Sequence, residues 1–144
     1  MQPENRLSTP RLLVGNLMDW IQGDPAKQAV LQKATGAGDE GAARLQQIVR
    51  SIEGVVDGWL AGRSGVEHVE RMMAAHRAAG VQLAWLLQAV RLLQEMGSRL
   101  QLPASYFEAS SDFRDACAIN YEQALLNQKD QEQHIRHQLF EALS

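Results

Sequence analysis

The chain has 144 residues, a length that suits one domain with a hydrophobic core of its own. Hydrophobic residues make up 45% of it and charged residues 22%, as in ordinary globular proteins. The net charge of −3 argues against a nucleic-acid-binding protein, which usually carries a basic face. The sequence contains no run of about 18 apolar residues, so no segment is predicted to span a membrane.

Two features of the sequence predict a cytoplasmic protein. The first residues, MQPENRLSTPRL, lack the basic and then apolar pattern of a signal peptide. Cys117 is the only cysteine, which excludes an internal disulfide and fits a reducing compartment.

The composition predicts an all-α fold, because Ala, Leu, Gln, Glu and Arg are abundant and alternating strand patterns are absent. In the segment STPRLLVGNLMDWIQG, Thr9 is expected to cap a first helix with Pro10 in its first turn. A second helix follows the same pattern, with Asp24 as the cap, Pro25 at the first position and Gly36 at the end. The segment TGAGDEG then predicts a short flexible break.

A third helix has the clearest helical period in the sequence. Its apolar residues recur at steps of three and four and predict one buried stripe: Leu45, Ile48, Val49, Ile52, Val55, Val56, Trp59 and Leu60. Gly54 and Gly58 interrupt it, each at a cost of about 1 kcal/mol relative to Ala, and are expected to allow close packing by a neighbour or a ligand. Ser64 and Glu67 form a predicted capping box for the next helix.

The fourth and fifth helices are predicted to meet at a bend near Gly80. The fourth carries on one face Val66, Val69, Met73, His76 and Gly80. The fifth, from about residue 82 to 102, is apolar nearly all round, which predicts a central place in the fold or a subunit interface. Pro103 is expected to end it.

The last helix is predicted to run from about Ser105 to the end of the chain. Its first half has an apolar stripe: Phe113, Ala116, Cys117, Tyr121, Ala124 and Leu125. The polar segment NQKDQEQH follows, and apolar residues then resume at Ile135, Leu139 and Leu143 with nearly heptad spacing. This pattern is typical of a signalling linker, so we expect a domain over 1–128 and a linker over 129–144 in a chain cut from a longer protein.

Histidines are the main candidates for ligand binding. His76, on an apolar helix face, is either an axial haem ligand or a core histidine with a satisfied hydrogen bond, and a lone histidine is more often the latter. His68 is expected at the surface. His134 and His137, near Glu141, have zinc-binding spacing but no further ligands in a tight motif, which favours a solvated helix surface. Cys117 is expected to pack in the core, because Arg114 is the one basic residue near it in the sequence.

Catalytic motifs are missing from the sequence. It contains no nucleophile elbow, no HExxH, no phosphate-binding glycine loop and no EF-hand loop. The segment EHVE does not recur as the paired Glu-x-x-His motif of di-iron bundles. The sequence therefore argues against an enzyme.

The segment VERMMAAHRAAGVQLAWLLQAVRLLQEM resembles the F–G region of bacterial globin-coupled sensors. In that family a glycine follows the proximal histidine by four residues, then come an aliphatic residue and a large apolar one, and His76, Gly80, Val81 and Trp85 stand in those places. The resemblance implies that His76 is the proximal haem ligand. It also implies a pocket around it: Val69, Met72, Met73, Gly80, Val81 and Trp85. The family's distal tyrosine has no counterpart, since the first tyrosine is Tyr106, and the region before His76 is short for helices A to E.

The whole chain also resembles the N-terminal domain of stressosome sensor proteins of the RsbR type. The likeness lies in an early helix with Trp20, a short second and a long third helix, a helix ending in AAGV, an apolar helix and a long exit helix. This resemblance implies a globin fold that generally lacks haem and forms dimers.

Together these features predict a globin-like bundle of about six helices with a long C-terminal exit helix. They predict the N-terminal sensory or regulatory domain of a bacterial cytoplasmic signalling protein, which acts through an output domain: a STAS domain, a diguanylate cyclase or a kinase. Whether a cofactor binds stays open, with haem the candidate. The residues expected to carry the homodimer and its signal are Leu92, Met96, Tyr121, Leu125, Ile135, Leu139 and Leu143. The alternatives are a haem-binding gas sensor with His76 as proximal ligand and a scaffold or dimerisation module without a ligand.

Overall fold

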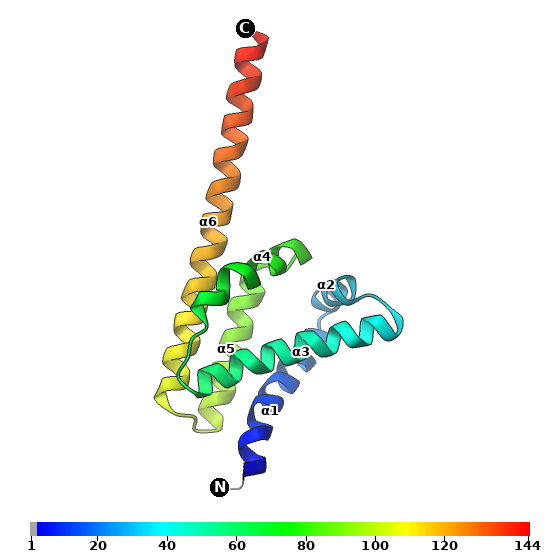
Figure 1. The fold of residues 1–144 in the computed structure, drawn as a ribbon, viewed down its shortest axis with the longest axis vertical. Coiled ribbons are helices and arrows are strands. Elements are labelled where there is room, and N and C mark those ends of the chain that lie inside the picture. The colour runs from blue at the N-terminus through cyan, green and yellow to red at the C-terminus, as the bar shows by residue number, and fades with distance from the viewer. Residues whose placement is uncertain (1–2) are drawn as a thin grey trace.

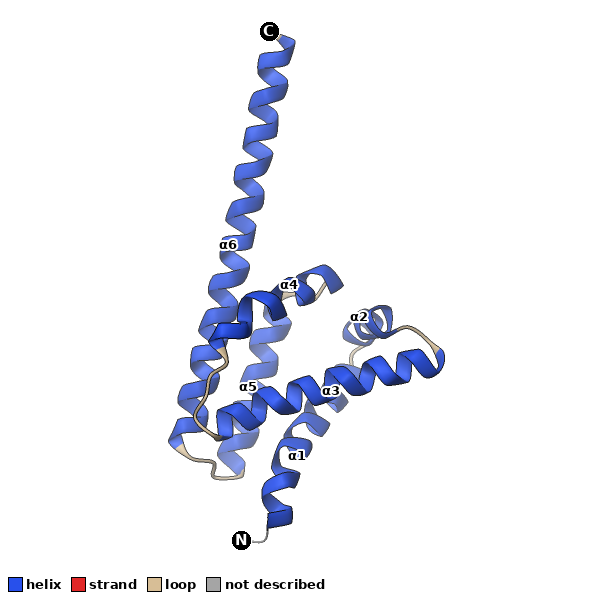
Figure 2. Cartoon of the chain, in the orientation of Figure 1, coloured by secondary structure: helices blue, strands red, loops and turns tan. Residues whose placement is uncertain are grey.

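A computed structural model describes the backbone of residues 3–144 and the side chains of residues 9–144. This part of the chain is all-helical and holds no strand, as Figure 2 shows, which confirms the predicted all-α class. The elements are α1 (Pro3–Gln22), α2 (Pro25–Thr35), α3 (Gly38–Leu60), a 3-10 turn η1 (Val66–His68), α4 (Val69–Ala79), α5 (Leu83–Arg99) and α6 (Ala104–Leu143).

The helices form a bundle from which half of α6 projects (Figure 1). α6 packs against α5, α4 and α3, while α1 packs against α3 and α5, and α2 lies against α3 and α1. Beyond Leu125 every residue of α6 is exposed, and the two ends of the chain lie at opposite ends of the molecule (Figure 1). The predicted long C-terminal helix is therefore confirmed.

Three aromatic rings stand at the centre of the core. The Trp59 ring of α3 lies 5.9 Å from the Tyr106 ring and 5.4 Å from the Phe113 ring of α6, between ring centroids. Tyr106 is fully buried, and its hydroxyl donates a hydrogen bond to the Leu93 carbonyl of α5 at 2.9 Å. This cluster joins α3, α5 and α6, and the phenol's polar group is satisfied where water cannot reach it.

The predicted ends of α2 are confirmed. The Asp24 carboxylate accepts a hydrogen bond from the backbone N–H of Ala26 at 2.9 Å, and Pro25 is the first helical residue. Gly36 ends the helix with a φ of 83°, in the left-handed range that glycine adopts without strain.

The predicted starts of α1 and α3 were wrong. α1 begins at Pro3, so Thr9 and Pro10 lie inside the helix and do not start it. Pro10 leaves the helix without one backbone N–H donor at this position. α3 begins at Gly38, so the predicted flexible break shrinks to residues 36 and 37. Asp39 and Glu40 stand in its first turn, where negative charge stabilises a helix.

The predicted capping box of Ser64 and Glu67 does not form. Gly65, with a φ of 75°, precedes the 3-10 turn η1, and no side chain caps that turn. The Ser64 carbonyl instead accepts a hydrogen bond from Trp59 Nε1 at 3.3 Å, which holds the loop against the core. Val66 lies in this turn and is 45% exposed, so it does not share the buried face of α4.

The bend at Gly80 is confirmed, but the predicted end of α5 is not. Gly80 has a φ of 86° and ends α4. α5 ends at Arg99, ahead of Pro103, because the chain turns through Gln101, whose φ is 55°. Pro103 instead stands directly before the first residue of α6.

The glycine that permits close packing between helices is Gly97, not Gly54. A Cβ atom at Gly54 would meet nothing within 4 Å, and one at Gly58 would lie 3.4 Å from the Arg63 carbonyl. A Cβ atom at Gly97 would lie 2.6 Å from the Tyr106 ring, so α5 and α6 approach each other over this glycine.

Candidate functional site

His76 lies in the last turn of α4 and is half-buried. Its Nδ1 is 2.6 Å from the Met72 carbonyl oxygen, one helical turn earlier. With Nδ1–H as the donor of this bond, Nε2 carries the free lone pair and is the atom that could bind a ligand or a metal. The helix itself thus fixes the orientation of the ring.

Three of the residues implied as a haem pocket around His76 pack in or against the core. Val69 and Met73, on the same face of α4 as His76, are 3% and 1% exposed and belong to the core. Met72 is half-buried and packs against that core. A haem in contact with Val69 and Met73 would have to displace this packing, so these two residues as arranged do not fit the group.

The corner between α4 and α5 is fastened to α6 by polar contacts. The Tyr121 hydroxyl donates a hydrogen bond to the Val81 carbonyl at 2.8 Å. The Arg77 guanidinium donates to the Asn120 side-chain carbonyl and lies 5.5 Å from the centroid of the Tyr121 ring. Burial raises the pKa of Tyr121, while the charge of Arg77 opposes this rise. A shift of the corner would therefore act directly on α6.

A groove of about 840 Å³ opens beside this corner. Arg77 and Ala78 of α4 and Leu83 of α5 form its wall. Its floor is the surface of α6: Ala118, Tyr121, Glu122, Ala124, Leu125 and Gln128. The lining is mostly apolar and includes one cation and one anion.

A second, smaller groove of about 260 Å³ lies between α1 and α5. Its lining residues are Leu12, Asn16, Trp20, Leu92, Met96, Arg99 and Leu100. His76 lines neither groove.

The residues expected to pair subunits lie in three places. Leu92 and Met96 face the smaller groove, and Tyr121 and Leu125 face the larger one. On the projecting half of α6, Ile135, Leu139 and Leu143 are 54%, 58% and 88% exposed. The last five of these seven residues all belong to α6.

Sequence reasoning missed a lysine held between two tryptophans. Lys27 Nζ lies 4.7 Å from the Trp20 ring centroid and 5.4 Å from that of Trp85, and the lysine side chain is 11% exposed. Asp24 Oδ2 accepts a hydrogen bond from the same ammonium group at 2.5 Å, which lowers the pKa of Asp24. These contacts join α1, α2 and α5 near the corner. The DPAK segment marks a helix start, and nothing local in it indicates the tryptophans.

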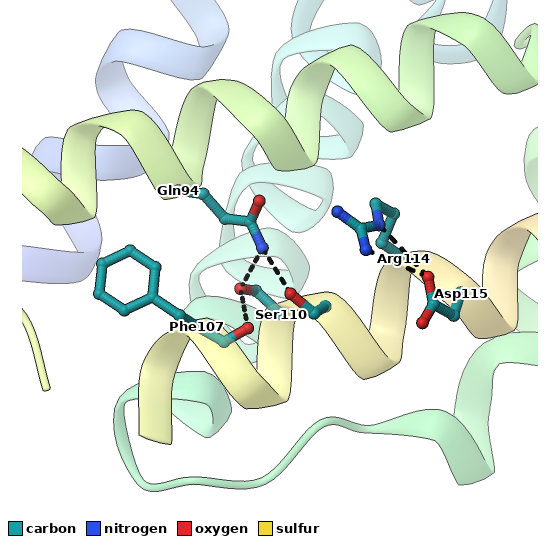
Figure 3. A network of polar contacts seen from close by, with 6 residues as sticks. Gln94, Phe107, Ser110, Arg114 and Asp115 are labelled. Atoms are coloured by element: carbon teal, nitrogen blue, oxygen red, sulfur yellow. Dashed lines mark hydrogen bonds and ion pairs between the residues drawn. The ribbon is translucent and has the colours of Figure 1, made fainter. Parts of the chain in front are cut away.

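A polar cluster between α5 and α6 was also missed, because α5 was predicted to be apolar nearly all round. Gln94 Nε2 donates hydrogen bonds to the hydroxyls of Ser110 at 2.9 Å and Ser111 at 3.0 Å (Figure 3). The buried Ser110 hydroxyl donates in turn to the Phe107 carbonyl at 3.1 Å. This chain of bonds fixes the relative register of the two helices.

The remaining candidates have structural surroundings. His68 is exposed, and His137 Nε2 lies 3.1 Å from Glu141 on the exposed end of α6, while His134 bonds Gln138 at 3.2 Å. The described side chains contain no group of three or more metal-binding residues. Cys117 is buried, as predicted, and burial raises its pKa to about 12.

Comparison with known protein families, curated protein sequences and solved structures finds no match to this chain. Over residues 3–144, no helix has both the length and the apolar character needed to cross a bilayer. We take as the candidate site the groove at the α4–α5 corner and the exposed stripe of α6 that continues from it, because polar contacts join this corner to α6.

Proposed function

We propose that this chain is the sensory or regulatory domain of a bacterial cytoplasmic signalling protein, with a globin-like arrangement of helices. In this proposal α6 pairs with the α6 of a second copy and passes a signal to an output domain: a STAS domain, a diguanylate cyclase or a kinase. The domain itself has no catalytic role. The resemblances to stressosome sensor domains and sensor globins support this proposal.

The observation that carries the proposal is the continuity of α6. Tyr106, Phe113 and Cys117 anchor its first half in the core, and the helix continues without a break to Leu143. Residues 126–143 extend it by roughly 27 Å at 1.5 Å per residue. Three large apolar side chains of this projecting part, Ile135, Leu139 and Leu143, are exposed, and such a surface calls for a partner.

In the proposed mechanism, the side-chain contacts between the α4–α5 corner and α6 transmit the signal from the domain to the exit helix. A stimulus shifts the packing of the segment HRAAGVQLAW, and the Tyr121–Val81 hydrogen bond and the Arg77–Asn120 contact transmit the shift to α6. Such a switch needs two packings that differ by only a few kcal/mol.

A helix-phase experiment tests this function. Residues 1–144 are fused ahead of a diguanylate cyclase domain, and insertions of one to seven residues are made after Gln128. If α6 transmits the signal as a rigid paired helix, cyclase activity varies with the inserted length and returns at seven residues, one heptad. Activity that is the same for every insertion would exclude transmission through α6 and favour a plain scaffold module.

A haem-binding gas sensor is the second candidate, favoured by the His76–Met72 hydrogen bond, which orients the ring as in metal-binding histidines. The core packing of Val69 and Met73 counts against it. Protein from haem-supplemented cells should show a Soret band that His76→Ala abolishes if this candidate is right. A colourless protein after reconstitution with haem rules it out.

A further inference from the structure

We propose that the groove beside the α4–α5 corner is the seat of α6 from a second copy of this chain, lying parallel, with Arg77 facing Glu122 of that copy. The inference rests on the exit-helix pairing of the proposed function and specifies its surface, direction and charge contacts.

The floor of the groove continues into the exposed stripe of α6. Alternating steps of three and four residues give one series along the helix: Ala118, Tyr121, Leu125, Gln128, Glu132, Ile135, Leu139 and Ala142. The first four line the groove, and the other four are exposed on the projecting half. The spacing of this series is that of the a and d positions of a two-stranded coiled coil, with Gln128 and Glu132 as its polar members. A helix that pairs with the projecting half along this series, the seam of the pair, runs directly into the groove.

The size of the lining side chains suits a helix as the occupant. Ala78, Ala118 and Ala124 leave space along the groove, and Leu125 at its centre is 53% exposed. Since the series lies on α6 itself, two-fold pairing brings the same surface of the two copies into contact. Leu125 of each copy is then buried against the other copy.

The two charges of the groove determine the direction of the second helix. Arg77 contacts Asn120 and Tyr121, which places it on one flank of the seam, whereas Glu122 lies on the opposite flank. Neither forms an ion pair with another described side chain. In a parallel pair, opposite flanks of the two helices face each other, so Arg77 of each copy meets Glu122 of the other. An antiparallel pair would instead bring Glu122 near Lys129.

Charge reversal tests the seat. Sedimentation equilibrium of the full chain is measured for Arg77→Glu, Glu122→Arg and the double variant, with Arg71→Glu as the control for an exposed arginine of α4. We expect each single reversal to raise the dimer Kd about tenfold, the double variant to return to near the original Kd, and the control to change nothing. Glu122 is exposed, so its variant reports on association even if Arg77→Glu disturbs folding.

A disulfide experiment tests the direction independently. Gln128→Cys should oxidise readily to a linked dimer, since a parallel seam brings residue 128 of both copies together, while Cys117 is buried and does not compete. A dimer Kd that neither charge reversal changes would show that α6 of the second copy does not lie in this groove, and the proposed function would stand. Rescue of Glu122→Arg by Lys129→Glu overturns the parallel direction. A chain that is monomeric at high concentration overturns the seat together with the exit-helix pairing.

Discussion

The Tyr121 hydroxyl and the Val81 carbonyl, 40 residues apart in the chain, are joined by a hydrogen bond of 2.8 Å. Val81 directly follows the bend at Gly80, and Tyr121 stands where α6 leaves the bundle. Arg77 adds a second connection, because it contacts both Asn120 and the Tyr121 ring. The corner and the exit helix are therefore coupled by polar contacts of Tyr121 and Arg77 in addition to the packing of the core.

Removing the Tyr121 hydroxyl should loosen this coupling. Tyr121→Phe keeps the ring and its contact with Arg77 but leaves the half-buried Val81 carbonyl without its donor. We expect the free energy of unfolding in urea to fall by about 1 kcal/mol, and hydrogen exchange at residues 80–83 to accelerate. Leu126→Ala, on the exposed part of α6, is the control and should change neither. Unchanged exchange at the corner in Tyr121→Phe would show that the hydrogen bond does not hold it.

Two glycine substitutions should have opposite effects. In Gly97→Ala the new methyl group meets the Tyr106 ring, and we expect unfolding to become easier by about 1–3 kcal/mol. Gly54→Ala adds a methyl group in open space within α3 and should stabilise the protein by up to about 1 kcal/mol. Urea denaturation of both variants gives the comparison. A stability of Gly97→Ala equal to that of the original chain would mean that α5 and α6 are not closely packed at this position.

Local signals allowed the sequence to predict the helices, but not the contacts between them. Asp24, Gly36 and Gly80 mark helix ends through their own conformational preferences, and these ends were found. The start of α1 was missed, because Thr9 and Pro10 are compatible with a helix start and also with a helix interior.

Within the candidate site, residues with a periodic pattern were predicted from the sequence, and residues whose role depends on contacts between helices were not. Tyr121 and Leu125 were identified from their period along α6, and both lie in the groove. Lys27 was not, because its surroundings are created only when α1, α2 and α5 come together. The role of Arg77 depends likewise on tertiary contacts with α6, for which the sequence of α4 carries no signal.

The lysine between the two tryptophans should contribute measurably to stability. Lys27→Met keeps the apolar stem but removes the charge that contacts the Trp20 and Trp85 rings and Asp24. We expect a loss of about 1 kcal/mol in the free energy of unfolding, with a change in native tryptophan emission. Lys33→Met, an exposed lysine of the same helix, should leave both measurements unchanged. Equal effects of the two substitutions would contradict a specific role for the buried ammonium group.

Stability should fall in alkaline solution, and Cys117 should account for a separable part of the fall. Burial raises its pKa from the ordinary value of 9.0 to about 12, and burial likewise raises the pKa of Tyr106. Above pH 9 the unfolded chain therefore releases the thiol proton while the native chain retains it, so the unfolded state binds fewer protons and gains stability as the pH rises. The contribution reaches about 1.4 kcal/mol per pH unit for each such group and ends once the native thiol also ionises, near pH 12.

Urea denaturation of the original chain and Cys117→Ala at pH 7, 9, 10 and 11 measures this contribution. Substitution changes the stability at pH 7 through packing alone, so the slope between pH 9 and 11 is the quantity to compare. The slope should become less steep in Cys117→Ala, while the buried Tyr106 maintains the remainder. Identical slopes in the two proteins would mean that the native thiol ionises as easily as the unfolded one, which the burial of Cys117 opposes.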